Sequence, residues 1–294
     1  MKLYTLKNSG YTAIINATNG ANCISLRHKN FPRGILREPN YEKGIDNPYL
    51  YGSPILFPVN RIENGAFYFN GRIYTFPINE KNTNCHLHGN LHQKEFTVIE
   101  QTENSITCYY EEKARVGFLH DYAITINYTL SDQGLLQIVT VKNLSDSEMP
   151  CMLGFHTTFS VKENCLIKTQ IDKEIERNMN NYLPTERVLP LDSDGKNLLN
   201  GTFTPKTLSK HYLAGGDTAE IFFPDEKVKV VYEYDKKYLY RLIYASQDFI
   251  CLEPQTCVVN APNLIGQLKN SGLISIKPYS ELNFYTKIRL KEDK

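Results

Sequence analysis

No segment of this 294-residue sequence shows sustained helical periodicity, which argues against a helical bundle and leaves room only for short helices. The sequence also lacks any apolar run of about 18 residues, the length that a membrane-spanning helix needs. Its first residues, Met1 to Asn8, contain no apolar stretch long enough for a secretory signal. We therefore expect a cytoplasmic protein without a membrane partner.

Neither sign of charge is in excess, because 33 basic residues stand against 32 acidic ones and the formal net charge is +1. Such a balance lacks the basic surface typical of nucleic-acid-binding proteins, so we expect no nucleic-acid partner. The seven cysteines are odd in number and irregularly spaced, which is not the pattern of a disulfide framework. We expect them to be reduced thiols, in agreement with a cytoplasmic location.

Tryptophan is absent as well, yet the sequence contains 20 Tyr and 14 Phe beside many Val, Ile and Thr. These residue types fit the pleated, half-buried surface of a β-sheet. Asn70-Gly71 separates two apolar runs and supplies the positive φ angles of a type I′ turn, which predicts a hairpin. Alternation predicts a strand at 122–130, and a polar turn separates it from a second strand at 135–141. Strand-like runs at 228–234 and 238–245 lie on either side of the polar turn 235–237, and runs at 273–276 and 282–290 predict a final antiparallel pair.

The segment 163–200 is the least strand-like part of the sequence, being polar and rich in Asn and Asp. We interpret it as a long excursion from one domain, because no internal repeat or low-complexity linker marks a boundary. Many short strands separated by turns predict an all-β sandwich or barrel. The length allows residues 1–294 to form a single domain of this kind.

Four local clusters contain residue types suited to chemistry: Gly52 to Gly65, Asn84 to Gly89, Leu153 to Phe159, and Cys251 to Asn263. Together they resemble the aldose 1-epimerase (galactose mutarotase) family. The second cluster is similar to the family's Leu-His-Gly segment, and the third to its Gly-x-His segment with a later Phe. The fourth is similar to the corresponding segment of the shorter bacterial members, which contains Glu-Pro. All four stand in the family's order.

This resemblance implies a fold, a reaction and a partner. The fold would be a large antiparallel β-sandwich, the galactose mutarotase-like supersandwich, with few short helices. The activity would be that of an isomerase, an aldose 1-epimerase that interconverts the α and β anomers of a free aldose in carbohydrate metabolism. The partner would be a small-molecule sugar, and no cofactor is implied.

The chemistry of the reaction explains the residue types. Opening a hemiacetal ring requires a proton to leave the anomeric hydroxyl and another to reach the ring oxygen, which one base and one acid can achieve. By resemblance, Glu253 takes the proton from the C1 hydroxyl and His156 protonates the ring oxygen. Arg61 and His88 would donate hydrogen bonds to sugar oxygens as charge shifts. Asn60 would orient a hydroxyl.

Each main candidate also has a purely structural interpretation. Arg61 alone would be a solvated surface cation, and His88 alone a half-buried strand histidine. His156 stands in an apolar run, where its ring needs a partner. A carboxylate in a strand as apolar as that of Glu253 must be paired, raised in pKa or functional. The joint pattern favours the catalytic interpretation.

The histidines around the second cluster offer a metal alternative. Residues i and i+2 of a strand share a face, so His86 and His88 could bind zinc together with a third ligand such as His92. No carboxylate stands at a recognisable zinc spacing, and Cys85 would point to the opposite face. We therefore predict no metal site.

The sequence departs from the family in one recognition element. Galactose mutarotases carry an Asp, followed by His, after the long excursion, and this Asp contacts sugar hydroxyls. The segment Leu208 to Leu213 contains no Asp, and Asp217 lies outside the motif. The Gln that many members place before the fourth cluster has no match around Leu242. We therefore expect an intact acid–base pair with altered hydroxyl recognition.

Two other functions remain open. One is a non-catalytic sugar-binding or regulatory module on the same fold, although a pure binder needs no acid–base pair such as His156 and Glu253. The other is a mutarotase for a phosphorylated sugar. Four basic residues could bind the phosphate or simply form an exposed basic loop: Arg27, Lys29, Arg33 and Arg37.

Overall fold

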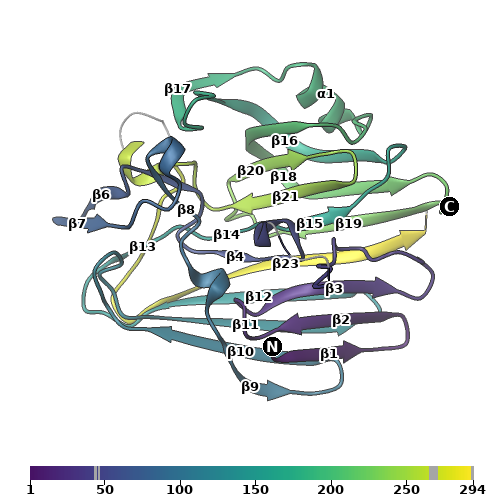
Figure 1. The fold of residues 1–294 in the computed structure, drawn as a ribbon, viewed down its shortest axis with the longest axis horizontal. Coiled ribbons are helices and arrows are strands. Elements are labelled where there is room, and N and C mark those ends of the chain that lie inside the picture. The colour runs from purple at the N-terminus through teal and green to yellow at the C-terminus, as the bar shows by residue number, and fades with distance from the viewer. Residues whose placement is uncertain (43–44, 46, 265–270, 293–294) are drawn as a thin grey trace.

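Antiparallel β-strands make up most of the computed structural model, which describes residues 1–42, 45, 47–264 and 271–292 (Figure 1). The described part contains one α-helix, α1 (Ser193–Asn200), and no helix long and apolar enough to cross a membrane. Short 3-10 helices add single turns: η1 (Pro48–Leu50), η2 (Lys81–Thr83), η3 (Leu91–Gln93) and η4 (Ala261–Leu264). The expected all-β fold with few short helices is confirmed.

The main sheet contains 14 strands. Its central path runs, in spatial order, through β4 (Ile55–Leu56), β14 (Gly154–Phe155), β21 (Phe249–Gln255), β20 (Tyr240–Ala245), β18 (Leu208–Phe223), β19 (Val228–Tyr234), β23 (Glu281–Glu292), β12 (Gly134–Asn143), β11 (Tyr122–Ser131), β10 (Ser105–Glu112) and β9 (Thr97–Gln101). The remaining members pair at its sides: β15 (Thr158–Ser160) with β21, and β16 (Leu166–Arg177) with both β18 and β17 (Pro184–Leu189).

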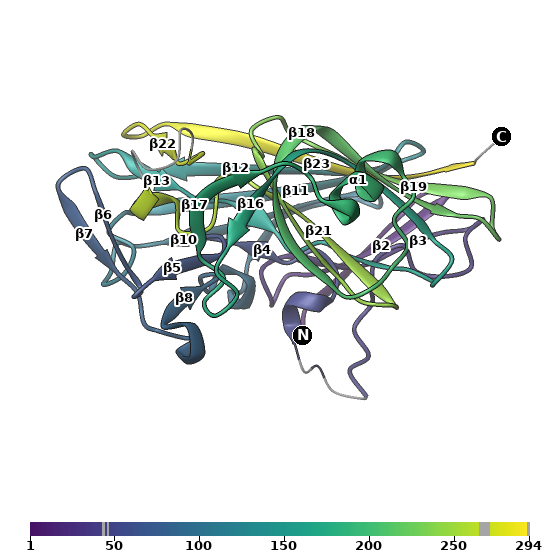
Figure 2. The ribbon, with the colours of Figure 1, turned by 90° about the horizontal axis from the view of Figure 1, so that it is seen from above.

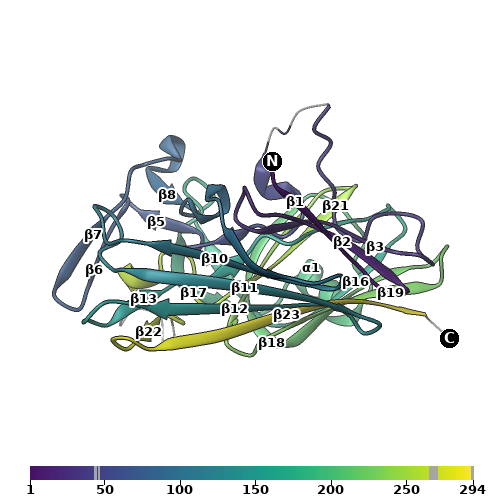
Figure 3. The same cartoon turned by 90° about the horizontal axis from the view of Figure 1, so that it is seen from below.

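Smaller sheets complete the architecture. A three-stranded sheet consists of β1 (Leu3–Lys7), β2 (Tyr11–Asn16) and β3 (Asn22–His28). Three further pairs are β5 (Arg61–Glu63) with β8 (Cys85–Leu87), β6 (Ala66–Phe69) with β7 (Arg72–Thr75), and β13 (Met149–Cys151) with β22 (Ile274–Ile276). Figures 2 and 3 turn the ribbon edge-on and show the strands stacked in layers, with β2 in contact with β11.

The space between the layers is filled by one large apolar core. Alternation along β11 buries every second side chain, as expected for a strand with one face on a core. Tyr128 of this strand reaches across the core, where its hydroxyl donates to Ala21 O (2.8 Å) and accepts from Gln137 Nε2 (2.8 Å). All seven cysteines are buried free thiols. The layered sheets and shared core are those of the predicted sandwich.

The strands expected from alternation are largely confirmed. The hairpin at Asn70-Gly71 joins β6 and β7, with φ angles of 44° and 81° at the turn. β11 and β12 also pair as neighbours. The ranges 228–234 and 238–245 correspond to β19 and β20, but both strands pair with β18 rather than with each other.

The expected final pair between 273–276 and 282–290 is wrong. β22 pairs with β13, whereas β23 lies between β12 and β19. Alternation identifies a strand but not its partner, because pairing depends on long-range contacts. Asn143, at the end of β12, helps to separate the two strands, since its Nδ2 donates to Ile276 O (3.0 Å) and Lys277 O (3.2 Å).

The polar segment 163–200 contains more strand than its composition suggested. It forms β16, β17 and α1, and β16 joins the main sheet through β18. Its polar residues lie largely on the exposed side, while Ile167, Ile171 and Ile175 are buried. Half-buried strands with few apolar residues are hard to distinguish from loops in a sequence. The segment is an excursion that returns to the sheet, and Arg177, the last residue of β16, lies near the candidate site.

Gly89→Ala is expected to destabilise the fold strongly, because the glycine has φ +60° and an added Cβ would lie 2.1 Å from Phe57 O. Gly71 is a matched control, since its φ is +81° but the nearest atom to an added Cβ is 4.0 Å away. Gly71→Ala should cost about 1–2 kcal/mol from the left-handed backbone alone. Gly89→Ala should cost about 4 kcal/mol or more in urea unfolding. Equal losses would show that the strand segment around Phe57 yields to the methyl group.

Candidate active site

The antiparallel register of three strands brings His156 and Glu253 together. Gly154 of β14 pairs with Gln255, and Thr158 of β15 pairs with Cys251, both in β21. His156 lies midway between Gly154 and Thr158, and Glu253 lies midway between Cys251 and Gln255. The two side chains therefore face each other. His156 Nε2 lies 3.2 Å from Glu253 Oε1, although 97 positions (253 − 156) separate them in sequence.

Both groups are withdrawn from solvent, with 7% of His156 and 1% of Glu253 exposed. Burial raises the pKa of Glu253, although the hydrogen bond from Gln255 and the positive charge of Arg177 act in the opposite direction. Burial lowers the pKa of His156. At neutral pH the pair therefore holds a single proton, with Nε2 and Oε1 3.2 Å apart.

A hydrogen-bond chain fixes the carboxylate of Glu253. Asn60 Nδ2 donates to Gln255 Oε1 (3.2 Å), and Gln255 Nε2 donates to Glu253 Oε2 (3.1 Å). Asn60 Oδ1 accepts from the backbone N–H of Arg61 (2.9 Å). The amide predicted to orient a sugar hydroxyl therefore also positions Glu253 through Gln255. The sequence analysis missed Gln255, although the i, i+2 spacing in a strand places it on the same face as Glu253.

His88 lies beside the pair in a left-handed backbone conformation, with φ 62°. Its Nδ1 accepts from the backbone N–H of Asn60 (3.3 Å), and its ring centroid lies 5.8 Å from that of His156. Burial holds the pKa of His88 well below its usual value, and the neighbouring positive charges act in the same direction. A neutral ring that accepts at Nδ1 carries its proton on Nε2, so His88 is a donor at that atom.

Tyr49, in η1, is a second residue that the sequence analysis missed. Its ring contacts three histidine rings, with centroid distances of 4.8 Å to His88, 4.7 Å to His92 and 5.9 Å to His156. The segment around it is not strand-like, and no local pattern identifies it. Its partly buried ring is one wall of the site.

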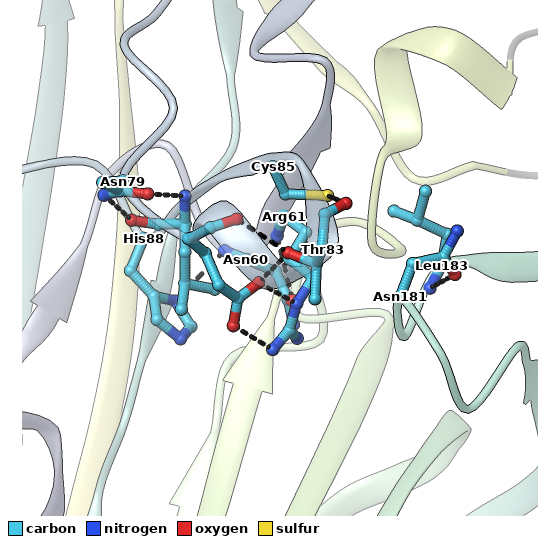
Figure 4. Close-up of polar contacts among 10 residues, drawn as sticks. Asn60, Arg61, Asn79, Thr83, Cys85, His88, Asn181 and Leu183 are labelled. Carbon is cyan, nitrogen blue, oxygen red and sulfur yellow. Dashed lines mark hydrogen bonds and ion pairs between the residues drawn. The ribbon is translucent and has the colours of Figure 1, made fainter.

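Arg61 lies at the start of β5 and forms two hydrogen bonds to one carboxylate. Its Nε donates to Glu80 Oε2 (2.7 Å) and its Nη2 to Glu80 Oε1 (2.8 Å), beside the hydroxyl of Thr83 (Figure 4). Burial alone would raise the pKa of Glu80, but the hydrogen bonds from Arg61 and Thr83 outweigh it and lower that pKa. The Arg61 charge is thus compensated, and its guanidinium carbon lies 4.7 Å from the ring centroid of Tyr182.

A second arginine, Arg177, approaches the same Tyr182 ring from the end of β16, at 5.8 Å. Its Nη2 donates to Ser209 O (2.6 Å) and Ser209 Oγ (3.1 Å). The sequence analysis missed this residue because it belongs to the excursion 163–200, far from every cluster. The positive charge of Arg177 lowers the pKa of Glu253, which places the two groups in electrostatic reach of each other.

The metal alternative rested on a shared face for His86 and His88, and that prediction is wrong. β8 ends at Leu87 and His88 has a left-handed backbone, so the strand alternation that would put His86 and His88 on one face does not extend to His88. His86 Nδ1 bonds Pro77 O (2.8 Å), and its ring stacks on Phe76. Residues 1–42, 45, 47–264 and 271–292 contain no group of three His, Cys, Asp or Glu placed to hold a metal ion.

The basic residues considered for phosphate binding are largely paired. Their carboxylate partners are found throughout the chain: Arg27 pairs with Glu38, Arg33 with Glu226 (3.7 Å), and Arg37 with Asp248 (3.1 Å). Their charges are thus offset by local acids. The paired arginines give no support for a phosphate site in this loop.

A pocket of about 440 Å³ opens next to the histidines. It shares Tyr49 and His86 with the surroundings of the site, and its wall is mainly aromatic, with Phe76, Phe118 and Tyr122. Neither member of the buried acid–base pair lines it.

Known proteins share sequence and fold with this chain. The family model described as aldose 1-epimerase matches residues 2–288. A solved galactose mutarotase-like protein from Clostridium acetobutylicum is 29% identical, with a TM-score of 0.89 over 98% of this chain and 94% of that one. Escherichia coli K12 YihR, an uncharacterized protein, is 28% identical over 116 residues, which are 39% of this chain and 38% of YihR. The match thus spans well under half of this curated relative.

More distant solved structures share the fold. A GalM/aldose epimerase homologue from C. elegans is 16% identical, with a TM-score of 0.80 over 100% of this chain and 99% of that one. The galactose 1-epimerase from Lactobacillus acidophilus NCFM is 13% identical, with a TM-score of 0.76 over 99% and 95% of the two chains. At such identities the likeness concerns the fold alone.

Proposed function

The chain belongs to the aldose 1-epimerase family, and from that membership we propose that it interconverts the α and β anomers of an aldose. The observation that carries this proposal is the buried contact of 3.2 Å between His156 Nε2 and Glu253 Oε1. A neutral sugar-binding surface has no need of a carboxyl and an imidazole that share one proton away from solvent. Such a pair is suited to move protons in two directions at once.

The reaction needs only these two groups. The Glu253 carboxylate takes the proton of the C1 hydroxyl while the His156 imidazolium delivers its proton to the ring oxygen. The C1–ring oxygen bond breaks and C1 becomes an aldehyde carbonyl, so protons and charge balance. Rotation about the C1–C2 bond exposes the other face of the carbonyl. Ring closure then returns both protons to where they began.

The ion-pair form of the pair is the one that reacts. Burial favours the neutral form, in which Glu253 carries the proton. The hydrogen bond from Gln255 and those from a bound sugar's hydroxyls favour the carboxylate instead. Sugar binding and activation of the base are therefore linked through the position of one proton.

Two residues would stabilise the sugar oxygens as charge shifts. His88 donates from Nε2, because its Nδ1 accepts from Asn60. Arg61 uses Nε and Nη2 on Glu80, and in the described part of the chain its Nη1 has no hydrogen-bond partner. We propose that Nη1 donates to a sugar oxygen while Glu80 holds the guanidinium in place.

We also propose that residues 1–294 form one sugar-binding catalytic domain that acts in the cytoplasm. The continuous core supports the first part, since buried apolar residues from Leu6 to Ile288 belong to one cluster. The seven buried free thiols support the second.

Exchange NMR of a panel of aldoses at anomeric equilibrium tests the proposed activity. At micromolar enzyme, at least one sugar should show α–β exchange well above the rate in buffer. Sugar binding without any acceleration across neutral and acidic aldoses would instead favour the non-catalytic binding module.

A further inference from the structure

Arg177 is a partly buried cation without an acidic partner. Its hydrogen bonds, 2.6 and 3.1 Å long, go to the neutral carbonyl and hydroxyl of Ser209. It forms no ion pair with any carboxylate in the part of the chain that the structure describes. Burial lowers its pKa to about 10, and the charge of Arg61 adds to that effect. The guanidinium is therefore still positive at neutral pH.

The nearby acidic groups are occupied elsewhere. Glu80 binds Arg61, and Glu174 binds Lys210 at 2.7 Å. Glu176, next to Arg177 in sequence, pairs with Arg187 at 3.2 Å. Glu253 holds the shared proton with His156 when the site is empty, because burial raises its pKa. None of the described carboxylates therefore pairs directly with the Arg177 guanidinium, although the charges of Glu253 and Glu174 act on it and raise its pKa.

The sheet register places this charge across the site from the reacting pair. Ile175 of β16 pairs with His211 of β18, which pairs with Leu242 of β20, which in turn pairs with Glu253. Paired residues share a face. The pairing of β16 with β17 is irregular between Ile175 and Arg177, but the charge of Arg177 still reaches Glu253 and lowers its pKa. Three strand spacings separate the β16 and β21 backbones by roughly 14 Å. A long arginine side chain crosses part of that distance toward Glu253.

We propose that Arg177 binds an oxyanion carried by the sugar, so that the substrate is an acidic aldose with a carboxylate or phosphate on the carbon farthest from C1. This inference rests on the proposed function and names its substrate class. Arg177 would anchor one end of the sugar while Glu253 and His156 act on the other. The loop arginines considered for phosphate are not part of this site.

The chemistry of the guanidinium favours an anion over a hydroxyl. A guanidinium can only donate hydrogen bonds, whereas a sugar hydroxyl both donates and accepts. The segment Leu208 to Leu213 offers no carboxylate, and Lys210 within it binds Glu174 and Asp192. His211 is fully buried and contacts Tyr240, so it does not replace the hydroxyl-binding Asp that this segment lacks. A partly desolvated cation without a directly paired carboxylate is costly until an anion binds.

The test compares glucose, glucuronate and glucose 6-phosphate by exchange NMR, with the rate in buffer subtracted. The preferred acidic sugar should have a kcat/KM about 10- to 100-fold above that of glucose, as expected for charge-assisted hydrogen bonds. Arg177→Met should remove most of this preference, and Arg177→Lys should retain part of it. Glucuronate and glucose 6-phosphate separate a carboxylate from a phosphate as the recognised group.

Arg187→Met is the matched control, since it also removes one positive charge from the excursion, but at a side chain that is 67% exposed. It should leave the preference for the acidic sugar unchanged. Equal kcat/KM values for glucose and both acidic sugars, or a preference that survives Arg177→Met, would overturn the inference. Circular dichroism establishes that each variant is folded.

Titration calorimetry with Glu253→Gln separates this inference from the proposed function. That variant should still bind the acidic sugar more tightly than glucose, and the added Arg177→Met should abolish the difference. If no sugar is turned over yet this binding difference holds, the proposed activity fails while anion recognition by Arg177 stands. If turnover occurs without any binding difference, the proposed activity stands and anion recognition by Arg177 fails.

Discussion

Glu253→Gln is expected to lower kcat by about 10²-fold or more while sugar affinity stays within a few-fold. The amide keeps the shape of the side chain and can still bond with Gln255, but it cannot accept the proton of the C1 hydroxyl. His156→Asn should have an effect of similar size, because it removes the group that protonates the ring oxygen. Exchange NMR with a sugar that the wild type turns over measures both variants.

The double variant should be little worse than the poorer single variant. Proton removal and proton delivery belong to one ring-opening event, so losing either group disables the step. His120→Asn is a matched control, because His120 is also a fully buried histidine but bonds Tyr74 (2.6 Å) away from the pair. It should retain kcat. Near-normal kcat with a raised KM in both single variants would show that His156 and Glu253 only hold the sugar.

Much of this fold could be predicted from local sequence patterns. Alternation from 122 to 130 predicts a strand because the core lies on one face, and β11 has that arrangement. Asn70-Gly71 predicts its hairpin because few residues tolerate positive φ. The final pair could not be predicted this way, since β22 and β23 choose partners that are distant in sequence.

The candidate site, like the fold, could be predicted only in part from local sequence motifs. His156, Glu253 and Arg61 stand in recognisable local motifs, and the register brings the first two into contact. Arg177 and Tyr49 stand in no motif, and only the folding of the excursion and of η1 brings them to the site. The sequence predicts Asn60 as a sugar ligand, whereas its bond to Gln255 forms only when the fold brings the bend before β5 onto β21.

The pH dependence of kcat/KM should be a broad bell with limbs displaced from the ordinary values of Glu and His. Burial raises the pKa of Glu253 to about 8 and lowers that of His156 to about 4. Between these values the pair holds one proton, which is the form that reacts. Activity should fall about tenfold per pH unit above the upper value, where that proton is lost, and below the lower value, where a second is gained. Limbs near pH 4.5 and 6.5 would show an unshifted pair.

The same burial makes a prediction for stability. The pKa of Glu253 is about 8 in the folded protein against 4.5 for an exposed glutamate, so folding favours its protonated form. As pH rises from about 4.5 to about 8, the unfolded chain loses this proton first and gains stability relative to the fold. Glu253→Gln has no such proton. Its free energy of unfolding should therefore rise relative to that of the wild type through that window, by up to about 1.4 kcal/mol per pH unit, and the difference should then level off.

Scanning calorimetry at pH 5 and pH 9 measures this difference. Glu253→Gln should melt close to the wild type at pH 5 and several degrees above it at pH 9, even though it is the less active protein. Glu103→Gln, at an exposed site, is the control and should show no pH-dependent gap. A Gln variant that melts below the wild type at pH 9 would mean that the ionised carboxylate is stabilised in the fold by Arg177 and His156 more strongly than burial opposes it.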